Sequence, residues 1–324
     1  MTVTIYEAAA PVEPVLTTPA QLREAPTTPK SDHSSSTSSN VGPPYLTIYP
    51  LDGSAGRLGN FFFRYASALG IAKANNMTLI LPDTELVRSM RENFHLTAPL
   101  ESELETPVDW SVHQNISEPS WGVFESRLFL LPRINTRLNW VYSQSWKYFY
   151  PIEEQIKEEF KLQPNGVRKN SSDFLARVRH EYKVDIVIGM HVRRGDFLRE
   201  NHQRWGYAVA TKEFFSNATK YFVDKYGKDI LFIVASDDRW WCQETIDFNG
   251  AFARFSTGES ALEDMTILRM CDHHVISVGS FGWWSAWLGH GEVVYYKNFP
   301  TPGSNHAKNH NPVDYYIPKW VPMV

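Results

Sequence analysis

The chain has 324 residues, of which 43% are hydrophobic and 14% aromatic, and this suffices for a large folded core in one or two domains. Its 32 basic and 36 acidic residues leave a net charge of −4 at pH 7, without the basic field that non-specific nucleic-acid binding needs, so we expect no nucleic-acid partner. Two cysteines, Cys242 and Cys271, exclude a disulfide scaffold and a cysteine-rich zinc site, and they permit at most one internal bridge.

The first 44 residues are rich in Pro, Ser, Thr and Ala, which predicts a disordered stem over 1–44. This segment has neither a cationic start with an apolar h-region nor the run of about 20 apolar residues that spans a bilayer, so no signal or membrane anchor is visible. Four glycosylation sequons favour a secretory route, although about half that number would arise by chance. They begin at Asn76, Asn115, Asn170 and Asn217.

The folded part begins with a strand, a turn and a helix. Residues 45–49 read as a strand, a turn follows over 56–60, and a helix is predicted from Phe61 to about Ala74. A second strand is predicted over 77–81. This order is typical of an α/β domain.

The middle of the chain separates two α/β regions. Residues 87–150 are rich in Trp, Phe and Tyr with weak periodicity, so no element is assigned there, and these side chains either pack or face a sugar. A helix is predicted from Pro151 towards Leu162, followed by a linker over 165–172. We therefore predict an N-terminal domain at 45–180 and a C-terminal domain at 181–324.

In the second region, short apolar runs alternate with helical stretches. This alternation predicts a mostly parallel sheet with right-handed crossovers. Two such sheets, one in each half, predict two Rossmann-like domains that face a cleft. The predicted strands are 186–190, 230–235 and 274–278, and the predicted helices are 211–226 and 261–271.

The first of these strands ends in two guanidiniums and a carboxylate. Arg193 and Arg194 come three and four residues after it, and Asp196 lies two residues after Arg194. Ligands lie at the carboxyl ends of strands in open α/β sheets, so adjacent arginines there predict an anion site, most simply for a phosphate. Asp196 would orient an arginine or take up a proton. The alternative is a surface turn held by an Arg–Asp ion pair.

The second strand ends in Asp237 and Asp238, which would hold a metal, bind ribose hydroxyls or cap the helix that starts near Trp240. An aspartate at a helix start is usually a cap. Hard cations need several oxygen ligands, and no further ligand cluster lies nearby in the sequence, so a metal role is disfavoured.

The third strand ends in a Gly-Ser turn that opens a helix. Backbone N–H groups and the positive end of the helix dipole at Ser280 would suit an anion. The spacing is neither a dinucleotide GxGxxG nor a Walker loop. Packing in the core is the favoured interpretation of the tryptophans that follow, and a stacking platform for a sugar or base is the alternative. These tryptophans are Trp283, Trp284 and Trp287.

Upstream of that turn, Ser260 and Glu263 fit a capping box. This leaves Asp264 free to point into a cleft. A carboxylate has two oxygens that match the N1–H and the exocyclic amine of guanine. A solvated acid on a helix is the alternative interpretation.

Taken in order, five segments resemble the galactoside α-1,2-fucosyltransferases, glycosyltransferase family 11, from about residue 48 to the C-terminus. The segments are 56–60, 191–196, 264 with 271–273, 280–284 and 317–321. The resemblance implies a GT-B architecture, GDP-fucose as donor, no cofactor, no metal, and fucose transfer with inversion to the 2-hydroxyl of a terminal galactose on a glycan. It also implies a Golgi enzyme with an N-terminal membrane helix.

The resemblance also assigns a donor site. Arg193 and Arg194 would bind the pyrophosphate, His191 would lie beside the nucleotide, and Asp264 would recognise guanine. The other donor-binding residues would be Ser280, Phe281 and Gly282 in the phosphate-facing turn, and Gly56 and Asn60 from the other domain. The family usually continues Gly-Asn with Gln, whereas this chain has Phe61.

Arg193 and Asp196 are the predicted catalytic residues. As the bond from fucose C1 to phosphate lengthens, a fixed guanidinium stabilises the charge that develops on the pyrophosphate. Asp196 is the first candidate for the base that deprotonates the acceptor, and Glu200 is the second. Two alternatives stay open: an inactive carbohydrate- or nucleotide-sugar-binding protein, and a fucosyltransferase that acts on another acceptor such as protein.

Overall fold

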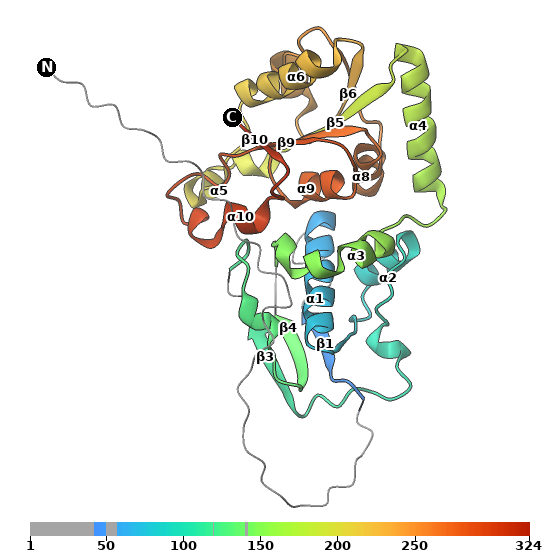
Figure 1. Cartoon of the computed structure of the whole chain (residues 1–324), viewed down its shortest axis with the longest axis vertical. Helices are drawn as coiled ribbons and strands as arrows, with labels where there is room; N and C mark the ends of the chain where they lie inside the picture. The colour runs from blue at the N-terminus through green and yellow to red at the C-terminus, as the bar shows by residue number, and fades with distance from the viewer. Residues whose placement is uncertain (1–41, 50–56, 119, 140–141) are drawn as a thin grey trace, which may run out of the picture. The chain divides into compact units, whose positions relative to one another are not determined.

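Two β-sheets organise the part of the chain that the computed structural model describes, residues 42–49, 57–118, 120–139 and 142–324 (Figure 1). The first has four strands in the order β2-β1-β4-β3, and the second has six in the order β10-β9-β8-β5-β6-β7. Neighbouring strands in both sheets run parallel, as the alternation of strands and helices predicts. Most of the predicted stem, 1–41, lies outside the described residues.

The first sheet carries a long buried helix. Helix α1 begins three residues earlier than the sequence predicts, and it is apolar on nearly every face because it lies between this sheet and α9 of the second half (Figure 1). The strands and helices of this half are β1 (Tyr45–Tyr49), α1 (Leu58–Ala74), β2 (Thr78–Leu79), α2 (Glu85–Asn93), β3 (His113–Ser117), β4 (Asn135–Asn139) and α3 (Glu153–Glu159).

Strand β5 (Ile186–Val192) lies inside the second sheet between β6 and β8, and is buried along almost its whole length. A continuous apolar run is what a parallel strand covered on both faces requires. The other elements here are α5 (Glu200–Trp205), α6 (Lys212–Tyr226), β6 (Ile230–Ser236), α7 (Arg239–Thr245), β7 (Phe252–Phe255), α8 (Ala261–Arg269), β8 (His273–Ile276), α9 (Ser280–Trp287), β9 (Val293–Tyr296), α10 (Pro312–Tyr315) and β10 (Val321–Met323).

The predicted linker over 165–172 is wrong. Helix α4 (Gly166–Tyr182) occupies most of that segment. The side chain of Asn165 caps it by accepting a 3.3 Å hydrogen bond from the N–H of Arg168, and Ser171 donates to the carbonyl of Val167 at 2.8 Å. Asn165 and Ser171, which are typical of turns, therefore serve as the cap and as a residue within the helix. The helix is stabilised because Phe174, Leu175 and Val178 bury one of its faces.

Aromatic side chains fill the core between the two sheets. Trp283 and Trp284 are 1% and 0% exposed and contact Phe63 of α1, which confirms that they pack in the core. Phe61 is also buried, and it stacks on Tyr65 with ring centroids 6.1 Å apart. The residue that departs from the family pattern is thus a core side chain. None of the described helices is long and apolar enough to cross a bilayer.

Candidate functional site

A cavity of about 470 Å³ lies where the carboxyl ends of β5 and β6 meet the first turns of α1 and α9. This volume is in the range of about 300–1,000 Å³ that small-molecule sites occupy. Residues of both halves of the chain line it. Those predicted from the sequence are Asn60, His191, Arg193, Asp196, Asp264, Ser280 and Phe281.

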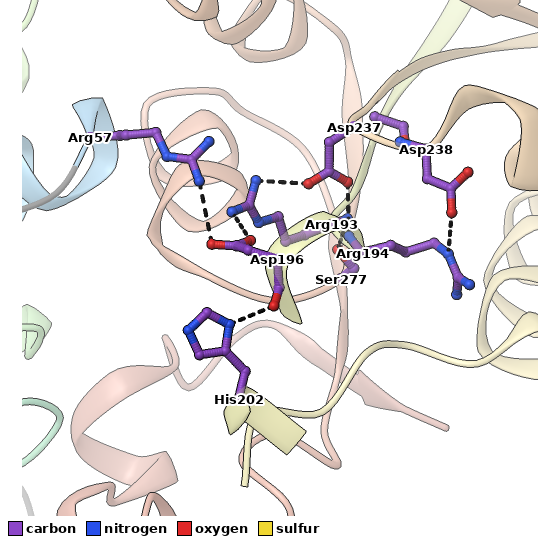
Figure 2. Close-up of polar contacts among 9 residues, drawn as sticks. Arg57, Arg193, Arg194, Asp196, His202, Asp237, Asp238 and Ser277 are labelled. Atoms are coloured by element: carbon purple, nitrogen blue, oxygen red, sulfur yellow. Dashed lines mark hydrogen bonds and ion pairs between the residues drawn. The ribbon is translucent and has the colours of Figure 1, made fainter. Parts of the chain in front are cut away.

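Arg193 is held between two carboxylates at the end of β5 (Figure 2). Its Nη1 donates to Asp237 Oδ2 at 2.8 Å, and its Nη2 pairs with Asp196 Oδ1. Its backbone N–H donates to Ser277 Oγ at 2.9 Å, and the side chain is only 17% exposed. The ion pair that the alternative interpretation expected is therefore present, and it fixes the guanidinium in the cavity wall.

Arg57 extends this chain of charges from the other half of the molecule. Its Nη2 lies 3.5 Å from Asp196 Oδ2, so the two carboxylates Asp196 and Asp237 face two guanidiniums (Figure 2). Arg57 is 74% exposed, which makes this contact weak and easy to exchange for another anion. Arg57 was not among the predicted site residues, although it belongs to the 56–60 segment. Gly56, predicted beside it, lies outside the described residues.

The side chain of Arg194 does not line the cavity. Its Nε donates to Asp238 Oδ2 at 3.0 Å (Figure 2). Its guanidinium lies 3.7 Å from the ring centroid of Trp241. Asp238 also accepts a 3.2 Å hydrogen bond from the N–H of Trp241, which confirms the predicted cap of α7. The structure therefore separates the two arginines, with Arg193 in the cavity and Arg194 packed against α7.

His191 is a buried, neutral member of the site. Burial, and secondarily the charge of Arg193, lowers the pKa of its imidazole to about 3. Its ring packs on Phe281 at 5.1 Å, and a Cβ at position 282 would stand 2.5 Å from its Nδ1. Gly282 therefore makes room for the imidazole, and it is not among the residues that line the cavity.

Asp264 lies in the first turn of α8 and accepts a hydrogen bond from Ser256 Oγ. Burial raises the pKa of its carboxyl, and the Ser256 hydrogen bond partly offsets that rise. Only half of the predicted capping box forms: Ser260 Oγ accepts from the N–H of Glu263 at 3.2 Å, but the Glu263 carboxylate accepts from the N–H of Glu259. Asp264 is still directed into the cavity.

The first turns of α1 and α9 meet at the cavity. Ser280 Oγ donates to Asn60 Oδ1 at 2.7 Å, and Gln144 Nε2 donates to the same oxygen at 2.9 Å. Gly279 caps α9 with φ at +87°, a conformation that costs glycine little and other residues much. A helix N-terminus attracts anions, so this turn and Arg193 together make the cavity suitable for a phosphate group.

The two candidate bases differ in position. Asp196 lines the cavity, whereas the side chain of Glu200 is 78% exposed, pairs with Arg204 and is absent from the cavity wall. Among the described residues, no group of three or more His, Cys, Asp or Glu side chains is arranged to hold a metal ion. Cys242 and Cys271 are buried free thiols, so the permitted bridge does not form.

Sequence reasoning missed the aromatic part of the cavity wall. These side chains come from distant segments, and the only signal in the sequence, the aromatic richness of residues 87–150, covers just Trp121 and Tyr142. They are Trp121, Tyr142, Phe197, Tyr207, Phe299, His306 and Tyr315.

The chain is similar in sequence and in fold to known proteins. A galactoside alpha-(1,2)-fucosyltransferase 2 of Pongo pygmaeus is 30% identical over 290 residues, 88% of this chain and 82% of that protein. A galactoside alpha-(1,2)-fucosyltransferase 1 of Leontocebus fuscicollis is 31% identical over 85% of this chain and 74% of its own length. The crystal structure of POFUT1 in complex with GDP aligns with a TM-score of 0.50 and 13% identity, over 80% of this chain and 100% of that one.

The structural likeness shows the fold, which is the GT-B architecture that the sequence resemblance implied. The sequence model described as "Glycosyl transferase family 11" matches residues 54–323, most of the chain. The chain therefore belongs to glycosyl transferase family 11.

Proposed function

We propose that this protein transfers L-fucose from GDP-fucose to the 2-hydroxyl of a terminal galactose on a glycan, with inversion at the anomeric carbon. One observation carries the proposal: Arg193, fixed between two carboxylates, shares a single cavity with the first turn of α9 and with Asp264, in a chain of glycosyl transferase family 11. The names of the curated relatives support galactose as the acceptor sugar.

The proposed donor pose follows the charges. The diphosphate lies between the Arg193 guanidinium and the N–H groups at the start of α9, and guanine lies against Asp264, whose carboxylate accepts from its two donor groups. Arg57 supplies a further cation for the phosphates when its guanidinium leaves Asp196. Crystallisation of POFUT1 with GDP, on the same fold, agrees with a guanine nucleotide here.

In the proposed reaction, the bond from fucose C1 to the β-phosphate oxygen breaks as the acceptor oxygen attacks C1 from the opposite face. Negative charge grows on the departing phosphate, where Arg193 and the α9 N-terminus stabilise it. Asp196 accepts the proton of the acceptor hydroxyl. Since Arg193 and the N-terminus of α9 supply the positive charge, we propose that no metal or other cofactor takes part. Activity retained in the presence of a chelator would support this.

We also propose that the enzyme acts in the Golgi lumen in association with the membrane, as members of the family resembled here do. The four sequon asparagines Asn76, Asn115, Asn170 and Asn217 are all exposed, which is compatible with N-glycosylation along a secretory route. A shift in electrophoretic mobility after removal of N-glycans from the cell-expressed protein would support that route.

The decisive experiment combines the protein with GDP-fucose, without added metal, and a panel of β-galactosides that includes a 2-deoxygalactoside. We expect an α-1,2-fucosylated product from the intact galactosides and none from the 2-deoxy sugar. Linkage analysis of the product excludes transfer to another hydroxyl. GDP-fucose binding without any product would favour an inactive binding protein, and fucosylation of protein alone would favour the other acceptor class.

A further inference from the structure

A wall of aromatic side chains borders the cavity beside Asp196, and the proposed donor pose uses none of it. We call Trp121, Phe197, Tyr207, Phe299 and His306 the aromatic wall. Its centre is a stack of rings: the His306 imidazole lies 4.5 Å from the Trp121 ring at 18° and 4.2 Å from the Tyr207 ring at 23°. All five side chains line the cavity.

Main-chain hydrogen bonds hold this wall in place. The N–H of Gln144 donates to the carbonyl of Trp121 at 2.7 Å, and the N–H of Gly122 donates to the carbonyl of Asn309 at 3.0 Å. The N–H of His306 donates to the carbonyl of Trp205 at 3.0 Å. The rings therefore keep their positions without a ligand, so binding there would cost little ordering entropy.

The wall is apolar and uncharged, with hydroxyl groups at its border. Burial lowers the pKa of His306 to about 4, so its imidazole is neutral at pH 7. The Tyr142 and Tyr207 hydroxyls make no hydrogen bond to any of the described residues, and both side chains are half-buried in the cavity. Flat apolar rings beside available hydroxyls suit a neutral sugar better than a phosphate.

The wall is also connected to the reacting groups. Phe197 contacts Tyr207 at 4.7 Å on one side and lies under the Arg193 guanidinium at 5.3 Å on the other. The Asp196 charge contributes to the raised pKa of Tyr207, after burial and Tyr142, so the carboxylate lies within electrostatic reach of that phenol. A sugar on the wall would therefore lie next to the proposed base.

We infer that the aromatic wall is the acceptor subsite, where a terminal β-galactose packs its apolar face against Tyr207 and presents its 2-hydroxyl to Asp196. Galactose suits this surface because its axial 4-hydroxyl leaves the hydrogens on C3, C4, C5 and C6 together on one face. This inference rests on the proposed function and adds to it the residues that select the acceptor.

The test measures three quantities: the KM for a β-galactoside, the KM for GDP-fucose, and the rate of GDP-fucose hydrolysis without acceptor. We expect Tyr207→Ala to raise the galactoside KM about tenfold or more while the two donor quantities change less than about threefold. Tyr207→Phe, which keeps the ring, should restore most of the acceptor affinity. Trp240→Ala removes a tryptophan that is 72% exposed and outside the cavity wall, and it should change nothing.

A second measurement needs no substitution. Saturation-transfer NMR on methyl β-galactoside, with the unaltered protein and GDP, should label H3, H4, H5 and H6 strongly and H2 weakly. Unchanged galactoside KM in Tyr207→Ala, or a shift in the donor KM and hydrolysis rate instead, would overturn the inference and leave the proposed function intact. Failure of the unaltered protein to fucosylate any galactoside would overturn both.

Discussion

Ser280 donates a 2.7 Å hydrogen bond from its Oγ to Oδ1 of Asn60, and so joins the first turn of α9 to the first turn of α1. Two residues separated by most of the chain thereby fix the two halves of the cavity against each other. Gly59 makes this approach possible, because a Cβ there would stand 2.6 Å from the carbonyl carbon of Ser280 and 2.7 Å from the nitrogen of Phe281.

Replacement of Gly59 by Ala is therefore expected to lower both the melting temperature and the rate of transfer. Alanine ordinarily favours a helix by about 1 kcal/mol over glycine, but the overlap with α9 costs about 1–3 kcal/mol or more and displaces the phosphate-binding turn. Gly166→Ala is the matched control, since a Cβ at the start of α4 meets no atom within 4 Å. Calorimetry and initial rates of transfer test both variants. A Gly59→Ala protein as stable and active as Gly166→Ala would contradict the proposed contact.

Arg193 and Arg194 should respond differently to substitution by lysine. Arg193→Lys replaces a fork shared by Asp196 and Asp237 with a point charge, so we expect kcat to fall on the order of 10²-fold or more. Arg194→Lys loses contacts to Asp238 and Trp241 outside the cavity, so stability should fall more than kcat.

Initial-rate kinetics and thermal unfolding of the two lysine variants show whether each arginine contributes to kcat or to stability. An equal loss of kcat in both would mean that Arg194 also reaches the pyrophosphate, as the family resemblance implies. Near-normal turnover in a folded Arg193→Lys protein would refute the role of Arg193 in the transition state.

The base assignment predicts opposite results for the two carboxylates near the end of β5. Asp196→Asn cannot accept a proton but can still hydrogen-bond to Arg193, so we expect kcat to fall about 10²–10⁴-fold while GDP still binds. Glu200→Gln, at an exposed side chain outside the cavity wall, should leave kcat unchanged. Transfer assays and titration calorimetry with GDP check this. The reverse pattern would make Glu200 the base.

Parts of the fold were readable from the sequence because burial left a local pattern. Strands β5 and β6 are continuous apolar runs bounded by polar residues, so their predicted positions agree with the structure within two residues. Strands β3 and β4 are mixed in polarity and only partly buried, and their sequences carry no such pattern. Helix α4 was missed because its polar first turns resemble a linker, while tertiary packing of its apolar face decides the outcome.

Some residues of the site could likewise be predicted from a local sequence pattern, and others could not. His191 lies near the end of β5, and Arg193 and Asp196 follow that strand, so a local pattern with an anion-binding rationale marks all three. The aromatic wall cannot be found in that way, because Trp121 and His306 belong to segments that meet only in the folded chain. Nor does the sequence distinguish Arg193 from Arg194, whose separation depends on the position of Trp241.

Three buried histidines predict how stability depends on pH. His191, His274 and His310 are each at most 9% exposed, and burial lowers the pKa of each to about 3. In the unfolded chain an imidazole has its ordinary pKa of about 6.5, so below that pH the unfolded state binds more protons than the folded state. The free energy of unfolding therefore falls as the pH falls below about 6.5, by on the order of 4 kcal/mol per pH unit for the three together.

This slope is measured by denaturant titrations between pH 6.5 and pH 5, above the range in which most carboxylates titrate. His274→Leu removes a buried imidazole that does not line the cavity, and should reduce the slope by about 1.4 kcal/mol per pH unit even if absolute stability changes. His180→Gln, at an exposed histidine on α4, should keep the wild-type slope. A slope that His274→Leu leaves unaltered would mean that His274 binds a proton in the folded protein.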